Sequence, residues 1–180
     1  MEYDCCIFCL NTLANVVELG RSGRDSLGGL KVPCSSGAKD DATGSALTVS
    51  GVEWLATFVK EGLSGIESLI LQGASSEVAG RQEGDVGEDM EEALVLGGNG
   101  CIVLGVLLRT GEVDLPTSTS HAPAVKVEDD EISRKILNVT TKEFIWRTLN
   151  AFLCMMEARV GMVSLGVGAP VIKLIKELRE

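Results

Sequence analysis

Aromatic residues are scarce in this sequence, and so is histidine. Only 4% of the 180 residues are aromatic, and there is a single histidine. Small-molecule pockets are usually lined by aromatic and other apolar side chains around a few polar groups, so this composition argues against an aromatic-rich ligand pocket. The longest apolar run, CIVLGVLL at 101–108, is far shorter than the roughly 20 residues of a membrane-spanning helix. We therefore expect no membrane span.

Positive charge is also in short supply. Lysine and arginine together number 16, against 26 aspartate and glutamate residues, which gives a formal net charge of -10. Phosphate backbones and anionic lipids attract chains of the opposite sign. The first residues, MEYDCC, lack the positively charged start of a secretory signal, so the six cysteines are expected to be reduced thiols. We expect an intracellular protein that makes no direct contact with nucleic acid or membrane.

Amphipathic segments are what the sequence does contain. Between residues 3 and 19, apolar residues recur at every third or fourth position, which is the spacing of one helical face. Further apolar residues, among them Cys5, Phe8 and Cys9, flank that face. This distribution predicts an inner helix that is buried on most sides.

The middle of the chain predicts more helices. Residues 51–72 favour one bent helix or two short ones, because two glycines weaken the centre, and Ser50 is a suitable N-terminal cap. Residues 90–109 favour a helix with a glycine-rich interruption. A buried strand over 101–108 is the alternative, because periodicity does not separate the two for a short apolar run.

The last third holds the clearest helix signals. Thr140-x-x-Glu143 predicts a capping box at a helix start, and Pro170 predicts the opening of a final helix. Helical spacing then assigns the inward positions of the two helices, which are Ile145, Leu149, Phe152 and Met156 in the first and Val171, Leu174, Ile175 and Leu178 in the second.

Three polar segments separate these helices. Residues 20–51, 73–92 and 111–130 are rich in glycine, serine or acidic side chains, and we expect all three to be mobile loops. The fold class is therefore predicted to be all-α, with residues 1–180 in one domain. Paired amphipathic helices cannot bury their apolar faces alone, so stacking into a helical solenoid is expected.

The Cys6-x-x-Cys9 pair, with Cys5 beside it, raises the question of metal or redox chemistry. A zinc site needs four ligands, and the only further candidates are Cys34 and His121. A thioredoxin-type pair follows a strand, for which there is no room here. We expect the pair to be buried as small hydrophobic side chains and protected from alkylating reagents.

Other candidate sites are weaker. GGNG at 97–100 lacks the Lys-Ser/Thr of a phosphate-binding loop. His121, with Asp114 and Glu128 near it in sequence, would suit a catalytic base, but no nucleophile motif accompanies it, and a solvated histidine is favoured. The acidic run at 83–92 lacks the ligand spacing of an EF-hand. We predict no catalytic, metal or cofactor site.

The order of the pieces resembles a known family. LANVVEL, CIVLGVLL and FIWRTLNAFLCMM, separated by a cysteine-bearing polar loop and an acidic insertion, are similar to the C-terminal part of the helical domain of the WAPL family, the cohesin-release factors. The resemblance implies a HEAT-like or armadillo-like repeat without enzymatic activity. It also implies a nuclear, chromatin-associated protein that works with cohesin subunits and their HEAT-repeat accessory protein to release cohesin from chromatin.

A partner-binding surface is suggested by basic side chains that stand out on an acidic chain. On the helix after residue 141, Arg147 and Asn150 point away from the apolar face, and Glu143 lies in the favourable order for an ion pair with Arg147. With Lys173 and Lys176 they form a candidate docking patch; the alternative is a solvated face.

Two other functions remain open on these residues. One is an unrelated armadillo-like adaptor in the cytoplasm. The other is a small α/β enzyme in which CIVLGVLL is a strand beneath the GGNG loop.

Overall fold

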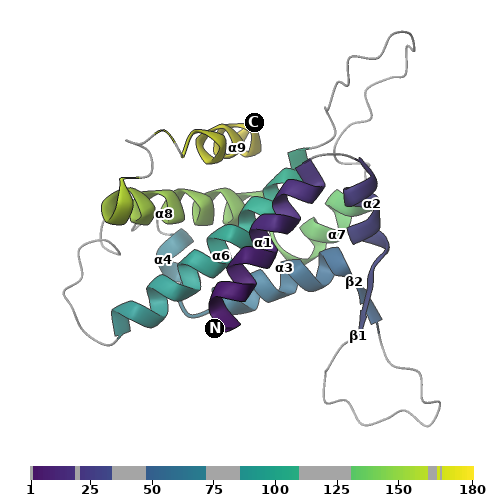
Figure 1. Cartoon of the computed structure of the whole chain (residues 1–180), viewed down its shortest axis with the longest axis horizontal. Coiled ribbons are helices and arrows are strands. Elements are labelled where there is room, and N and C mark those ends of the chain that lie inside the picture. Colours follow the sequence, from purple (N-terminus) through teal and green to yellow (C-terminus); the bar gives the residue numbers. More distant parts are fainter. Residues whose placement is uncertain are drawn as a thin grey trace.

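The computed structural model describes residues 2–18, 21–33, 48–71, 86–109, 131–161, 166 and 168–180. These residues form eight helices and two short strands, so the all-α expectation is confirmed (Figure 1). The elements are α1 (Glu2–Glu18), α2 (Arg21–Gly29), β1 (Lys31–Pro33), β2 (Thr48–Ser50), α3 (Gly51–Gly62), α4 (Glu67–Leu71), α6 (Val86–Arg109), α7 (Glu131–Val139), α8 (Lys142–Val160) and α9 (Ala169–Arg179).

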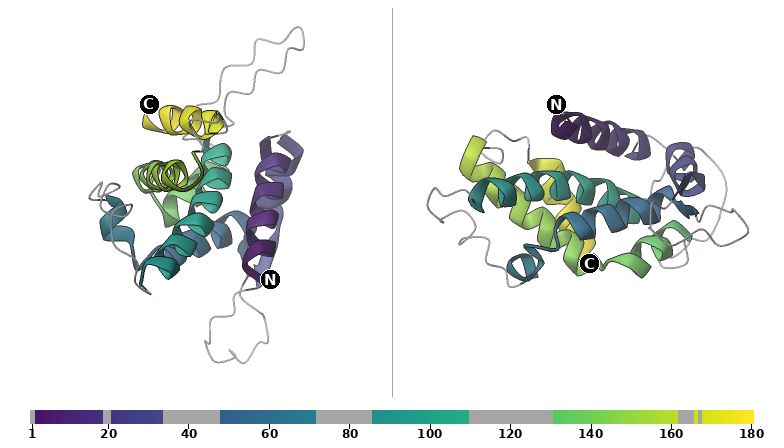
Figure 2. Two further views of the ribbon diagram at one scale, coloured as in Figure 1. Left: turned by 60° about the vertical axis from the view of Figure 1, so that its left-hand side comes forward. Right: turned by 90° about the horizontal axis from the view of Figure 1, so that it is seen from below.

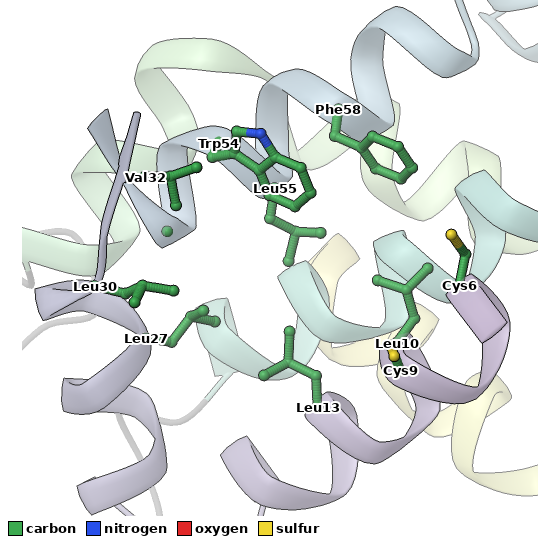
Figure 3. Close-up of a pocket in the computed structure, with 11 residues that line it drawn as sticks. Cys6, Cys9, Leu10, Leu13, Leu27, Leu30, Val32, Trp54, Leu55 and Phe58 are labelled. Atoms are coloured by element: carbon green, nitrogen blue, oxygen red, sulfur yellow. The ribbon is translucent and has the colours of Figure 1, made fainter. Parts of the chain in front are cut away.

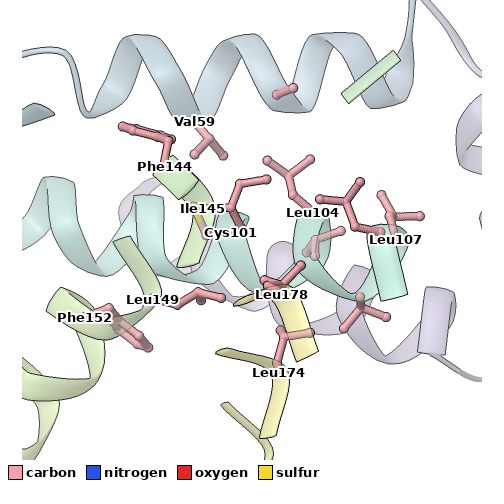
Figure 4. Packing of buried hydrophobic residues seen from close by; sticks show 14 of the residues in the cluster. Val59, Cys101, Leu104, Leu107, Phe144, Ile145, Leu149, Phe152, Leu174 and Leu178 are labelled. Atoms are coloured by element: carbon pink, nitrogen blue, oxygen red, sulfur yellow. The ribbon is translucent and has the colours of Figure 1, made fainter. Parts of the chain in front are cut away.

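The long helix α6 lies at the centre of the fold. It packs against α1, α3, α7, α8 and α9, with α1 on one side and α8 and α9 on another (Figure 2). Its residues Leu104 and Leu107 are fully buried in the core that these helices share (Figure 4). The strand alternative for 101–108 is therefore wrong, because the segment is the second half of a helix.

The expected glycine-rich interruption of this helix is also wrong, since α6 is continuous. Its glycines serve close packing instead. A Cβ atom at Gly97 would lie 2.6 Å from the side chain of Leu63, and one at Gly98 would lie 2.5 Å from the ring of Phe152. The missing side chains let neighbouring elements approach the helix closely.

Part of α6 has the length and composition of a membrane span. Residues Asp89–Arg109 pass that test, but 67% of the apolar window is already buried inside the fold. The core helix of a compact domain has the same properties, so the finding is weak support for a membrane segment.

Helix α1 is present as expected, but it is not an inner helix. Leu10 and Val17 are buried against the rest of the core, whereas Phe8 is 73% exposed and Val16 is 46% exposed. The reason is that α6 takes the central place, and α1 packs mainly on α6 and α2. One side of α1 therefore faces outward.

The expected loop over 20–51 is wrong for its two ends. Residues after position 20 form α2 and β1, and β1 pairs with β2 in an antiparallel ladder that sets Val32 opposite Val49. Helix α2 is held by the burial of Arg24 and Leu27, which its glycine-rich composition concealed. Residues 34–47 lie outside the described part of the chain.

The other two expected loops fall largely outside the described residues. This holds for all of 111–130 and for 73–85, while 86–92 belong to α6. For residues 51–72 the sequence left open one bent helix or two short ones, and the described part of this segment forms two helices, α3 and α4. Ser50 caps α3 in a capping box: its hydroxyl accepts from the Glu53 amide at 3.3 Å, and its hydroxyl and amide hold the pKa of the Glu53 carboxyl below its ordinary value.

Near the C-terminal side, one helix was missed and one cap was misplaced. Helix α7 buries Ile136, and the amide of Thr140 still donates to the Ile136 carbonyl. Thr140 therefore belongs to the end of α7. The cap of α8 is Thr141, whose hydroxyl accepts from the Phe144 amide at 3.0 Å.

The predicted inward faces of the last two helices are confirmed. The buried set includes Ile145, Leu149, Phe152, Val171, Leu174, Ile175 and Leu178, and Met156 packs against it partly buried. Helix α8 ends at Gly161, which has a positive φ of 63°, and Pro170 stands in the first turn of α9.

Candidate functional site

An apolar groove of about 440 Å³ lies between α1 and α3 and is bounded at one end by α2 and β1 (Figure 3). We call it the α1–α3 groove. The described residues that line it are Cys6, Cys9, Leu10, Leu13, Leu27, Leu30, Val32, Gly51, Trp54, Leu55 and Phe58. Volumes of this size are typical of binding sites.

The aromatic wall of the groove comes from α3. Trp54 and Phe58, four residues apart on one side of the helix, stack with ring centroids 5.4 Å apart and an interplanar angle of 14°. Neighbouring Leu55 and Val59 point into the core, which fixes the rotation of α3. The rings are therefore held toward α1, and Trp54 keeps 45% of its surface exposed.

The end of the groove near β1 is held by backbone geometry. The amide of Gly51 donates to the carbonyl of Leu30 at 2.8 Å, so the end of α2 is tied to the start of α3. In Figure 3, Leu27, Leu30 and Val32 lie together at this end. A Cβ at Gly51 would stand 2.9 Å from the Leu27 carbonyl oxygen, so this contact requires glycine.

The thiols of α1 do not behave as predicted. Cys5, Cys6 and Cys9 are all exposed, because α1 is a surface helix, and Cys6 and Cys9 line the groove. The expected burial is therefore wrong, and the expected protection from alkylation loses the burial on which it was based. Cys34 and His121, the other candidate zinc ligands, lie outside the described residues, within which no three His, Cys, Asp or Glu side chains are grouped to hold a metal.

The cysteine that does serve packing is Cys101 in α6. It is fully buried, and burial raises the pKa of its thiol to about 12, while the neighbouring Thr148 hydroxyl acts in the opposite direction. Cys154 on α8 is exposed.

The predicted basic patch lies on the paired helices α8 and α9. Arg147 is 2.9 Å from Glu143, as the sequence predicted, and Lys173 is 3.7 Å from Glu177. Asn150 and Lys176 are exposed. Two of the four predicted residues are thus partly neutralised by acidic neighbours.

One basic residue of this region was missed. Arg179 lies 5.1 Å from the centroid of the Trp146 ring, and Arg147 lies 5.0 Å from the same centroid. Both guanidinium groups therefore lie near one indole ring, whose negative face attracts cations. Arg179 follows Lys176 by three positions, which is the only signal that could have placed it. We call Trp146, Arg147, Asn150, Lys173, Lys176 and Arg179 the α8–α9 basic surface.

The remaining candidate motifs receive no support as sites. GGNG lies inside α6, where the Asn99 side-chain amide donates to the Val95 carbonyl at 2.7 Å. His121, Asp114 and Glu128 lie outside the described residues. The described lining of the α1–α3 groove holds no carboxylate, imidazole or ammonium group, so its chemistry is suited to binding.

Comparison of the chain with protein-family models, with curated proteins and with solved structures finds no match in any of the three.

Proposed function

We propose that this chain is a non-enzymatic protein-binding domain of the WAPL type, which regulates sister-chromatid cohesion by promoting the release of cohesin from chromatin. One observation carries the proposal. The resemblance rests on the segments 13–19, 101–108 and 144–156. Their described residues, 13–18, 101–108 and 144–156, lie in α1, α6 and α8, and α6 packs against both of the other helices. They form one packed unit, as expected of segments that belong to a single domain.

A HEAT-like or armadillo-like repeat is the finer description that we propose for the fold. Helices α8 and α9 pack as a consecutive pair, and both lie against α6. Repeat proteins bury apolar faces in this way, helix pair on helix pair, and present extended surfaces to partners. In this proposal the protein acts in the nucleus, on chromatin, together with cohesin subunits and their HEAT-repeat accessory protein.

Two surfaces support a binding role. The α1–α3 groove is apolar and open, which suits a side-chain-mediated contact, and the α8–α9 basic surface is suited to an acidic partner region because opposite charges steer association. Neither surface, in the described residues, combines a nucleophile with a base. This composition favours contact with another protein over catalysis.

Affinity capture tests the proposal. The full chain, tagged and incubated with nuclear extract, is expected to retain cohesin subunits and the HEAT-repeat accessory protein. The variant Arg147→Glu with Lys173→Glu is expected to keep its helical signal and melting temperature and to lose this capture. Arg134→Glu, an exposed charge reversal on α7, is the matched control and should capture normally.

Capture should also weaken as salt rises above physiological strength, where the screening length falls below about 8 Å. Wild-type protein that retains no cohesin subunit contradicts the proposal. A set of cytoplasmic proteins in their place would favour the unrelated armadillo-like adaptor.

A further inference from the structure

The α1–α3 groove leaves apolar side chains at the surface that the fold itself does not cover. Trp54 is 45% exposed and Leu30 is 52% exposed, and both line the same hollow. Away from the groove, the described core contains completely buried side chains such as Leu63 and Leu104. Large exposed apolar patches on a compact domain mark interaction sites.

The chemistry of the lining selects the kind of occupant. Among the described residues that line the groove, the only polar side-chain atoms are the indole N–H of Trp54 and the thiols of Cys6 and Cys9. An extended peptide brings a free N–H and C=O group with every residue, and these need partners when they are buried. A helix satisfies its own backbone and presents apolar side chains at i, i+3, i+4 and i+7. The groove therefore favours a helix over a strand.

The charge around the groove indicates which charge the polar face of a bound partner helix should carry. Glu61 lies one turn after Phe58 on the same side of α3, is exposed, and forms no ion pair within the described residues. In Figure 3, Phe58 and Cys6 lie at the same end of the groove, so Glu61 places a negative charge beside this end. Helix α1 contains no basic residue. A positively charged partner is complementary to this end.

We propose that the α1–α3 groove receives one cationic amphipathic helix of a partner protein. Its apolar face lies against Leu13, Trp54 and Phe58, and Lys or Arg residues of its polar face lie beside Glu61. The positive end of the helix dipole favours an orientation with the N-terminus toward Glu61. This occupant assumes the protein-binding role proposed above but does not depend on cohesin as the partner.

The alkylation rates of individual cysteines can report where a peptide binds. Cys6 and Cys9 line the groove, whereas Cys5 is exposed on the same helix outside it and Cys154 is exposed on α8. The probe is a synthetic Leu/Lys peptide of roughly 14 residues, about four helical turns, with leucines at helical spacing. Alkylation of each cysteine is followed by mass spectrometry with and without peptide. Saturating peptide is expected to slow alkylation of Cys6 and Cys9 and to leave Cys5 and Cys154 unchanged.

Two control peptides test the chemistry. A peptide with the same leucine positions and Glu in place of Lys should bind about tenfold more weakly, because it meets Glu61 with like charge. A Leu/Lys peptide that alternates with strand periodicity should give no protection.

Matched variants test the location. Trp54→Ala should weaken peptide binding about tenfold or more, as expected for a central aromatic anchor, while Phe8→Ala, an exposed aromatic outside the groove, should not. Glu61→Lys should weaken binding and Asp89→Lys, an exposed acid on α6, should not. If a variant does not fold, the cysteine pattern of the wild-type chain still decides.

Several results would overturn the assignment. Equal protection of Cys5 and Cys154 means that the cationic peptide adheres to an acidic surface. Protection by dodecanoate but not by the Leu/Lys peptide means a hydrocarbon ligand. Protection that rises with protein concentration alone, together with a dimer mass, means a second copy of the chain.

The experiments distinguish a wrong groove assignment from a wrong proposed function. Peptide protection without capture of cohesin would retain the groove assignment and reject the WAPL-type role. Capture of cohesin that is unchanged in Trp54→Ala, without peptide protection, would reject the groove assignment alone.

Discussion

The central helix α6 meets its neighbours in two different ways. Toward α3, α8 and α9 its glycines stand opposite large side chains, among them Val59, Phe152 and Leu174. Toward α1, none of the described α6 glycines has an α1 side chain as its nearest neighbour, and α1 and α3 leave the groove between them.

This difference means that different residues contribute to the stability of the fold and to binding. Close approach at the glycine contacts removes apolar surface from water and fills space at interior density. Between α1 and α3, where no described residue of α6 lines the groove, incomplete closure leaves apolar surface for another molecule. Substitutions on the closed side should therefore act on unfolding, and those on the open side on binding.

The largest expected effect tests the closed side. Leu104 is fully buried, so Leu104→Ala should lower the free energy of unfolding by about 3 kcal/mol through lost contacts and a residual cavity. Leu13→Ala, on the half-buried groove wall, should cost about 1 kcal/mol. Urea unfolding curves measure both, and similar losses would mean that the two sides are equally packed.

The next effect concerns the glycine contacts. Gly98→Ala should lower the free energy of unfolding by about 2 kcal/mol, because the new methyl group meets the Phe152 ring at 2.5 Å. The control is Gly62→Ala at the end of α3, where nothing lies within 4 Å. There the better helix propensity of alanine should stabilise the fold by up to about 1 kcal/mol. Thermal melts would contradict this account if both changes had the same sign.

A pH effect sharpens the contrast between closed-side and surface thiols. The pKa of Cys101 is raised from 9.0 to about 12 by burial, so the unfolded chain releases this proton first as pH rises. The contribution of Cys101 to the free energy of unfolding is fully present below pH 9. Above that pH the free energy of unfolding should fall by about 1.4 kcal/mol per pH unit. Unfolding between pH 8 and about 10 measures this slope.

Cys101→Ala should remove most of that slope, whatever its effect at neutral pH. Cys154→Ala, at an exposed site, should keep it. A slope that survives in Cys101→Ala would assign the titration to another group.

The smallest expected effect concerns an exposed ion pair on α8, away from both the closed core and the groove. Glu143→Gln removes the partner of Arg147, 2.9 Å away in an exposed helical pair, and should cost less than about 0.5 kcal/mol. The loss should shrink in high salt. A larger, salt-independent loss would show that the α8–α9 basic surface contributes to the core.

Elements with strong helical periodicity could be predicted from the sequence. Helices α1, α8 and α9 carry apolar residues at regular spacing, and their existence and the inward positions of α8 and α9 follow from it. Helix α2 was missed because it is rich in glycine and serine. Helix α7 carries apolar residues at helical spacing, with Ile132 and Ile136 four positions apart, so its signal was present in the sequence although the helix is only nine residues long.

The groove could not be predicted, for a reason of geometry. Its walls come from residues about 45 positions apart, such as Cys9 and Trp54, and the space between them depends on how α6 sets the distance between α1 and α3. The exposure of Cys6 followed from the same packing. The pairing of Arg147 and Arg179 on Trp146 likewise depends on how two helices cross.

Arg109, the last residue of α6, holds the two ends of the fold together. Its guanidinium lies 3.5 Å from Glu18 at the end of α1 and 3.5 Å from Glu177 in α9. Contacts so distant in sequence raise the contact order and slow folding. At about 5 to 20 residues per second, α6 is completed roughly 5 to 18 seconds after α1 during synthesis. Throughout that interval the apolar face with Leu10 and Val17 has no α6 to cover it, so this face of α1 stays open to unwanted contacts while the chain is being made.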